Sequence, residues 1–262
     1  MRLLNSFILF LLFFCFKDVA VAQTGKKQLH LYILMGQSNM AGRGKVTGEL
    51  ETLSHPRVFM LDANGEWQPA KNPVHFDKPK VAGVGPGLSF GIEMAQLDST
   101  VEVGLVPCAV GGTSIEKWQS GAYDAATKTH PYDDAVVRIK KAMENGVVKG
   151  MIWHQGEANS SSKDSTAYIN KLKDVIDRVR TLTNNSKLPV VIGELGQYKE
   201  QYQQFNKILA QVPGKIPFTA LATSEGLIHN GDNTHFDGNS ANEYGKRYAV
   251  EMKKLQKATA RK

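Results

Sequence analysis

Short runs of apolar residues alternate along the chain with longer segments in which apolar residues recur every three or four positions. The short runs are rich in Val, Ile and Leu and have few polar interruptions, which is typical of strands covered on both faces of a sheet. The pattern predicts five such strands, at residues 29–35, 101–106, 151–153, 188–192 and 218–222.

The longer segments predict helices between these strands and after the last one. They lie at residues 88–96, 134–145, 167–182 and 201–211. A final helix is predicted to start near Ser240, because Glu243 completes a Ser-x-x-Glu capping box. Strands that alternate with helices favour an α/β fold, here a three-layer α/β/α arrangement around a five-stranded, mainly parallel sheet.

The segment between the first two predicted strands, residues 44–86, is long and irregular in its pattern. We expect it to be a surface excursion that carries part of a ligand cleft. No internal repeat, low-complexity segment or linker divides the sequence, so residues 23–262 are predicted to form a single domain.

The first 22 residues have the pattern of a targeting segment rather than of a folded element. Arg2 gives the start a positive charge, residues 7–16 are apolar, and Ala20-Val21-Ala22 provides an A-x-A cleavage site. This order predicts a secretory signal peptide, residues 1–22, that is removed before Gln23. About ten apolar residues are too few to span a bilayer, which takes roughly 20. We therefore expect a secreted or periplasmic protein without a stable membrane anchor.

Composition and charge exclude several classes of protein. An apolar fraction of 42% and a charged fraction of 22% allow a sizeable core and argue against a disordered chain. The net charge of +7 raises the question of nucleic acid binding, but the lysines are spread over helices and the C-terminal segment, so no nucleic acid partner is expected. Removal of the signal peptide leaves Cys108 as a lone cysteine, expected to be a core thiol.

Polar, glycine-containing segments follow four of the predicted strands. These segments are residues 36–44, 107–114, 154–157 and 229–237. In parallel sheets, ligands bind beyond the carboxyl ends of the strands. The sequence therefore predicts a site assembled from four segments that lie far apart along the chain.

The residues in these segments fit the requirements of serine hydrolysis, which needs a nucleophile, a base, an orienting carboxylate and donors for an oxyanion. Ser38 follows the first strand, and Asp232 and His235 are three residues apart, a spacing that places both side chains on one face of a turn. Asp232 can accept a hydrogen bond from one ring nitrogen of His235, which leaves the other free to take the proton of Ser38.

The same segments resemble the ordered sequence blocks of the SGNH/GDSL hydrolase superfamily. The matching blocks are Gly36-Gln37-Ser38-Asn39-Met40-Ala41-Gly42-Arg43, Gly111-Gly112-Thr113-Ser114, His154-Gln155-Gly156-Glu157 and Asp232-x-x-His235. Within the superfamily they resemble the branch of sialate O-acetylesterases and family-6 carbohydrate esterases, which are acetylxylan esterases. The resemblance implies a flavodoxin-like SGNH fold, a serine carboxylic-ester hydrolase, an acetylated carbohydrate substrate, and no cofactor.

By position, the resemblance implies Ser38 as nucleophile and His235 as base, with the Ser38 and Gly112 amides as oxyanion donors. The sequence departs from the wider superfamily in two places. Gly-Gln-Ser replaces Gly-Asp-Ser, and His-Gln-Gly-Glu stands where Gly-x-Asn-Asp is usual. The usual oxyanion asparagine is then missing, and Gln155 is its expected substitute.

The second departure leaves two candidates for the third member of the triad. Asp232 lies three residues before His235, as in the superfamily pattern, and is the favoured carboxylate. Glu157 ends the block that contains Gln155 and is the alternative, because it could reach the same imidazole.

Three further residues are predicted to bind substrate. Asn39 and Arg43 belong to the first matched block, although Arg43 could instead be a structural ion-pair residue. Trp118 is a candidate platform for stacking against a sugar ring.

Two other functions remain open from the sequence. A non-catalytic carbohydrate-binding relative would use similar polar and aromatic residues. A metal-dependent hydrolase would recruit His154, Glu157, Asp232 and His235, but no His-Glu-x-x-His helix or close histidine pair supports it, and we expect no metal. The expected reaction is two-step acyl transfer that releases acetate from an acetylated sugar of the xylan or sialic acid type.

Overall fold

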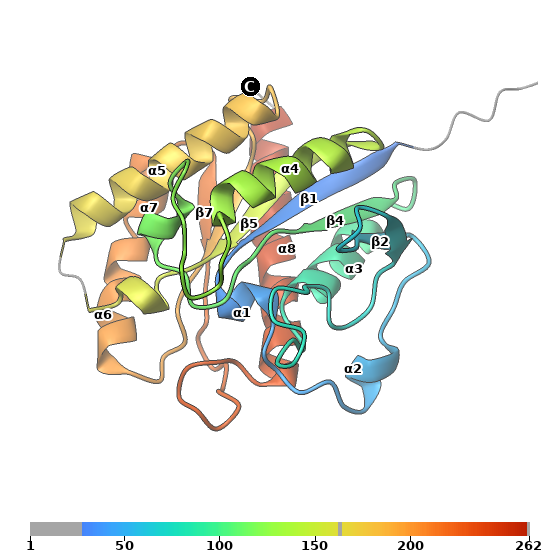
Figure 1. Ribbon diagram of the computed structural model, residues 1–262. Coiled ribbons are helices and arrows are strands. Elements are labelled where there is room, and N and C mark those ends of the chain that lie inside the picture. Colours follow the sequence, from blue (N-terminus) through green and yellow to red (C-terminus); the bar gives the residue numbers. More distant parts are fainter. Residues whose placement is uncertain (1–27, 162–163, 261–262) are drawn as a thin grey trace, which may run out of the picture.

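The computed structural model describes residues 28–161 and 164–260, which form a seven-stranded sheet with helices on both faces (Figure 1). The strand order is β3-β2-β4-β1-β5-β6-β7, and neighbouring strands are parallel except for β2 and β3. The strands are β1 (Leu29–Gly36), β2 (Val58–Leu61), β3 (Trp67–Pro69), β4 (Val103–Pro107), β5 (Gly146–His154), β6 (Val190–Gly193) and β7 (Thr219–Ala222). The predicted signal peptide, residues 1–22, lies outside the described residues.

Helices cover the two faces of the sheet in separate groups. They are α1 (Ser38–Ala41), α2 (Glu49–Thr52), α3 (Gly87–Leu97), α4 (Pro131–Met143), α5 (Ser165–Leu182), α6 (Glu200–Leu209), α7 (Val212–Lys215) and α8 (Gly238–Ala260), with 3₁₀ turns η1 (Ile115–Trp118) and η2 (Glu157–Asn159). The core on one face contains residues of α4, α5 and α6, and the core on the other face contains residues of α3 and α8. Over the described residues, no helix combines the length and the apolar character needed to cross a bilayer.

β1 lies at the centre of the sheet and is buried on both sides. Leu31, Ile33 and Met35 contribute to the core beneath α4 and α5, whereas Tyr32 and Leu34 contribute to the core beneath α3 and α8. Successive residues of a strand alternate between the two faces, so a strand with two cores has a continuous apolar sequence. The predicted three-layer α/β/α fold is confirmed.

The prediction of five strands was wrong, because β2 and β3 lie inside residues 44–86, which were expected to be irregular. These strands have only four and three residues, and Pro, Gly and charged residues on both sides interrupt the apolar pattern. The turn between them is fixed by Asp62, whose carboxylate accepts hydrogen bonds from the amides of Asn64 (2.8 Å) and Glu66 (2.9 Å). A turn sequence of Asp, Asn and Gly between short apolar runs is a hairpin signal.

The predicted capping box at the start of the last helix was also wrong. α8 begins at Gly238, and the carboxylate of Asp237 accepts a hydrogen bond from the Ser240 amide at 2.7 Å. Asp237 therefore provides the acceptor for one of the amides in the first turn of the helix, which have no partner within the helix. The Ser240 hydroxyl instead accepts a hydrogen bond from the Ile228 amide at 2.9 Å and ties down the loop that precedes α8.

Trp118 is a core residue, so its predicted role in sugar stacking was wrong. Its side chain is fully buried, its ring meets Trp153 edge-on at 5.4 Å, and its Nε1 donates a hydrogen bond to the Thr113 hydroxyl at 2.9 Å. The η1 turn directs the indole inward, between the sheet and the helices of that face. Cys108 is buried as predicted, and burial raises the pKa of its thiol to about 12.

A buried ion pair joins the end of α1 to the 44–86 segment and to the loop after β4. Arg43 Nη2 lies 2.7 Å from Asp77 Oδ2, and the same carboxylate oxygen accepts a hydrogen bond from the Gly111 amide at 2.8 Å. Burial acts to raise the pKa of Asp77, but the bonds from Arg43 and Gly111 outweigh it and hold that pKa below its ordinary value. Asp77 is therefore an ionised anchor for three segments.

Replacement of Trp118 by Ala is expected to lower the free energy of unfolding by about 3–5 kcal/mol, because it leaves a large cavity in the core. Urea denaturation of the two proteins measures this difference. Val137→Ala on α4 is the control, since Val137 is 68% exposed and its truncation should change stability little. A loss of less than about 1 kcal/mol for Trp118→Ala would contradict the core role.

Asp77→Asn is expected to destabilise the protein by about 3–5 kcal/mol at neutral pH, because it leaves the Arg43 charge buried without its partner. The pKa of Asp77 is lower in the folded than in the unfolded chain. Its contribution is therefore fully present above the unfolded value of 3.8 and is lost as pH falls through the folded value. Urea denaturation between about pH 3 and pH 7 should show a stability difference that shrinks below about pH 4. A constant difference over this range would contradict the assignment.

Candidate active site

Segments from the carboxyl ends of several strands converge on an open cleft at one edge of the sheet. The cleft has a volume of about 580 Å³, and its lining includes Ser38, Arg43, Lys78, Gly112, Asp232 and His235. Lys78 comes from residues 44–86, so the expectation that this excursion carries part of the cleft is confirmed. Residues 154–157 do not belong to this lining, and the Glu157 side chain is only 4% exposed.

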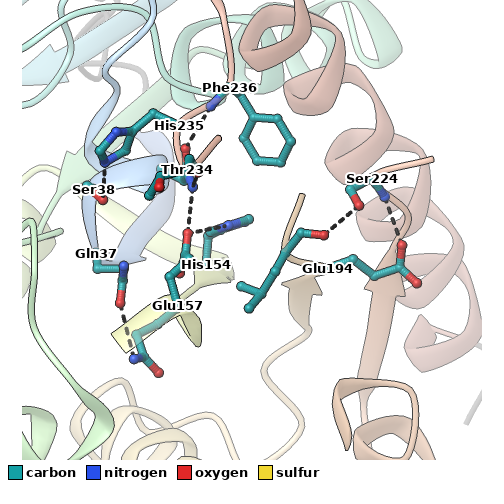
Figure 2. A network of polar contacts seen from close by, with 12 residues as sticks. Gln37, Ser38, His154, Glu157, Glu194, Ser224, Thr234, His235 and Phe236 are labelled. Atoms are coloured by element: carbon teal, nitrogen blue, oxygen red, sulfur yellow. Dashed lines mark hydrogen bonds and ion pairs between the residues drawn. The ribbon is translucent and has the colours of Figure 1, made fainter. Parts of the chain in front are cut away.

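Ser38, His235 and Asp232 form a continuous chain of hydrogen bonds. Ser38 Oγ lies 2.9 Å from His235 Nε2, and His235 Nδ1 lies 2.6 Å from Asp232 Oδ2. Figure 2 shows the imidazole directed at the serine hydroxyl. The three residues that sequence spacing selected are therefore in contact, although Ser38 and His235 come from opposite ends of the chain.

Asp232 also shapes the turn that carries the histidine. Its Oδ1 accepts hydrogen bonds from the amides of Thr234 and His235, each at 2.8 Å, while Oδ2 contacts the ring. Partial burial acts to raise the pKa of Asp232, but these amide and ring contacts hold it below its ordinary value. The carboxylate is therefore ionised and fixes both the backbone and the ring of His235.

The position of Ser38 depends on a close approach of β1 to β5. Gly36 has φ +132°, and a Cβ on this residue would lie 2.0 Å from the carbonyl oxygen of His154. Only glycine fits there. The chain then turns directly into the short α1 helix, whose first residue is Ser38, with the Gly42 amide donating to the Ser38 carbonyl at 2.9 Å.

Two backbone amides at the cleft lack acceptors within the described residues. Ser38 opens α1, so its N–H has no partner inside the helix. Gly112 has φ +87°, lies in an exposed turn, and its N–H makes no hydrogen bond in the described part of the chain. The neighbouring Gly111 amide is held by Asp77, which fixes this turn beside Ser38. Arg43 also lines the cleft, but its guanidinium is occupied by Asp77 and by the Gly42 carbonyl at 2.6 Å.

Gln155 does not reach the cleft, contrary to its predicted role as an oxyanion donor. Its side chain is fully buried, and its Nε2 donates to Asn159 Oδ1 at 2.7 Å, with the oxygens of Thr113 and Gln37 at 3.3 and 3.2 Å. Its Oε1 accepts from the Tyr168 hydroxyl at 3.0 Å. The sequence block indicated correctly that Gln155 is near the site, but the side chain points into the core.

Asn39 and Glu157 contact each other instead of substrate and imidazole. Asn39 is buried, and its Nδ2 donates to Glu157 Oε1 at 2.5 Å and to the Thr234 carbonyl at 3.0 Å, while its Oδ1 accepts from the Phe236 amide at 3.1 Å. Glu157 makes no hydrogen bond to His235, and Figure 2 shows it beside His154. The predicted substrate-binding role of Asn39 was therefore wrong, because every polar atom of its side chain is used inside the protein.

Sequence reasoning missed three residues around the cleft. Asp77 and Lys78 lie in the irregular 44–86 segment, where no motif or period singles them out. Asn230 lies within the recognised 229–237 segment, and its Nδ2 contacts the Arg43 carbonyl at 3.4 Å. Over residues 28–161 and 164–260, no group of three or more His, Cys, Asp or Glu side chains is arranged to hold a metal ion.

The chain is similar to known proteins over most of its length. Residues 28–254 match the family model of carbohydrate esterases described as sialic acid-specific acetylesterases. The chain is 32% identical over 228 residues to the probable carbohydrate esterase At4g34215 of Arabidopsis thaliana, covering 78% of this chain and 83% of the relative.

Two solved structures have the same fold. The crystal structure of the Arabidopsis thaliana protein AT4G34215 superposes with a TM-score of 0.76 at 27% identity, over 87% of this chain and 98% of that one. The crystal structure of NanS has the same fold, with a TM-score of 0.71 at 15% identity, over 89% of this chain and 99% of that one. The chain belongs to the carbohydrate esterase family of sialic acid-specific acetylesterases and is a carboxylic-ester hydrolase.

Proposed function

We propose that the protein is a secreted carbohydrate O-acetylesterase that removes acetyl groups from acetylated sugars through a serine acyl-enzyme. The observation that carries the proposal is the chain of hydrogen bonds from Ser38 through His235 to Asp232, three residues that line an open cleft. Membership of the carbohydrate esterase family supports the acetylated sugar as substrate class.

In the first step, Ser38 Oγ attacks the acetyl carbonyl carbon while His235 Nε2 takes its proton. The imidazole becomes positively charged, and Asp232 stabilises this charge through its 2.6 Å contact with Nδ1. The carbonyl oxygen becomes an oxyanion in the tetrahedral intermediate. The amides of Ser38 and Gly112 are its proposed donors, because they have no other acceptor among the described residues and belong to residues that line the cleft.

The intermediate collapses when His235 gives its proton to the sugar oxygen, which breaks the ester bond and leaves an acetyl group on Ser38. A water molecule then attacks this acetyl ester with His235 as its base. A second tetrahedral intermediate forms and breaks, acetate leaves, and the Ser38 hydroxyl is restored. The same two amides serve both intermediates, and no step draws on a cofactor.

Reaction with a serine-directed phosphonate separates this mechanism from its alternatives. Phosphonylation of Ser38 together with loss of acetate release supports the serine esterase. Activity that is sensitive to chelators and leaves Ser38 unlabelled would indicate a metal-dependent hydrolase. Sugar binding without labelling or acetate release would indicate a non-catalytic relative. Acetylated xylan, O-acetylated sialic acid and aryl acetates are the substrates to compare, because the sialic acid and xylan types are both proposed.

Ser38→Ala is expected to abolish acetate release and phosphonate labelling. Asp232→Asn is expected to lower kcat by roughly 10⁴-fold, because it favours the wrong tautomer of His235 and removes the stabilisation of the imidazolium. Steady-state acetate release measures both effects, and circular dichroism checks that the variants are folded. Near-normal turnover of Asp232→Asn, together with an inactive Glu157→Gln, would reassign the carboxylate of the triad.

The N-terminal pattern supports secretion with cleavage after Ala22. Expression in a secreting host should therefore give a protein whose first residue is Gln23, as read by N-terminal sequencing or intact mass. Replacement of Ala20 and Ala22 by Arg should block processing, because the cleavage site requires small residues at these positions. Retention of residues 1–22 on the exported wild-type protein would contradict the proposal.

A further inference from the structure

We propose that Asn39 is a positioning residue that clamps the turn of His235 against the helix of Ser38, and that the buried Glu157 orients the amide of this clamp. The Asn39 clamp is defined here as the contacts of the Asn39 side chain with Glu157, Thr234 and Phe236. This inference rests on the proposed esterase function, because the effect of the clamp on catalysis is measured as acetate release.

The contacts of Asn39 connect the two halves of the site directly. Asn39 follows Ser38 within α1. Its Nδ2 donates to the carbonyl of Thr234, and its Oδ1 accepts from the amide of Phe236, so one side chain binds the backbone on both sides of His235. Movement of the His235 turn away from Ser38 therefore requires that both hydrogen bonds break.

Glu157 determines the orientation of the side-chain amide of Asn39. The two ends of an asparagine amide are nearly equal in shape, but one end donates and the other accepts. An ionised carboxylate accepts only, so Glu157 Oε1 requires the NH₂ end of Asn39 to face it. The oxygen end then faces the Phe236 amide. In the reversed orientation, two acceptors would face each other at Glu157 and two donors at Phe236.

The carboxylate of Glu157 is buried and incompletely hydrogen-bonded. Its Oε1 lies 3.3 Å from Nε2 of the fully buried His154, whose Nδ1 is 3.0 Å from the Tyr248 hydroxyl. Its Oε2 is buried and has no hydrogen-bond partner within the described residues. Burial acts to raise the pKa of Glu157, but His154 and Asn39 hold it below its ordinary value.

An incompletely bonded buried carboxylate disfavours folding, whereas an apolar side chain of similar length would not. Departures of this kind from a well-packed apolar core are typical of functional sites. Glu157 does not touch the imidazole, so its effect on the reaction has to pass through Asn39. A loss of alignment between His235 and Ser38 of about 1 Å costs roughly 10²-fold in rate.

The test compares Glu157→Met, Glu157→Gln, Asn39→Ala and the double variant Asn39→Ala/Glu157→Met in acetate release. Glu157→Met should lower kcat roughly 10²-fold with KM changed less than about twofold, because alignment and not binding is affected. Glu157→Gln should recover most of this loss, since its amide oxygen can still accept from Asn39. The double variant should be no slower than Asn39→Ala, because Glu157 acts through Asn39.

Glu194→Gln is the matched control. Glu194 follows β6 and holds the Ser224 amide at 2.9 Å, and Figure 2 shows it apart from Glu157. This variant should have unchanged kcat. Thermal unfolding shows whether each variant is folded. If Glu157→Met does not fold, Glu157→Leu measured with and without Asn39→Ala gives the same coupling, because leucine also lacks the acceptor for Asn39.

Several results would overturn the proposal. Normal kcat in Glu157→Met would remove any role in alignment, and multiplicative effects in the double variant would show that Glu157 does not act through Asn39. An inactive Glu157→Gln would show that Glu157 contacts the imidazole of His235.

A readout independent of activity is the downfield proton resonance of His235 Nδ1–H, which should be lost in Asp232→Asn and kept in Glu157→Gln. Absence of acetate release and of Ser38 labelling in the wild type would refute the esterase function instead, and leave the resonance comparison intact.

Discussion

The hydrogen bond between Ser38 and His235 joins the end of the central strand to a loop 197 residues further along the chain. Both partners have to be held in place for this contact to form. For Ser38 this is achieved by β1, which is buried on both faces and paired on both edges with β4 and β5. Gly36 then allows the chain to pass close to the His154 carbonyl. The His235 turn lies outside the strands. Polar contacts hold it, together with the buried ring of Phe236, which packs edge-on against His154 and Tyr244.

The loops around the cleft depend on carboxylates that are kept ionised by the donors around them. Asp77 holds the Gly111 amide, Asp232 holds the amides of its own turn, and Glu157 holds the amide of Asn39. A carboxylate accepts but does not donate, so each one determines which end of a neighbouring group faces it. Two of these groups are largely buried, at a cost in stability. The geometry of the cleft therefore depends on carboxylates that can only accept hydrogen bonds and so fix the orientation of the groups that donate to them.

Much of the fold could be predicted, because strands with two buried faces leave continuous apolar runs and helices with one buried face leave apolar residues at every third or fourth position. β2 and β3 escaped prediction because each is a very short apolar run set among Pro, Gly and charged residues. Within the site, the blocks identified which residues lie near Ser38 but not where their side chains point. Gln155 and Asn39 belong to these blocks but are buried, and Trp118 packs in the core. The direction of a side chain depends on the packing of distant segments, which single-sequence patterns do not contain.

The two candidate carboxylates illustrate this difference. Asp232 reaches His235 within one turn, and its contacts with that ring and with the intervening amides involve residues at most three apart. Such a contact follows from spacing and needs little from the rest of the fold. Glu157 meets Asn39 across 118 residues, because β1 pairs with β5 and brings the ends of both strands together. A motif can show that the two residues belong to one site, but only the pairing of the strands decides that Glu157 contacts Asn39 and not the imidazole.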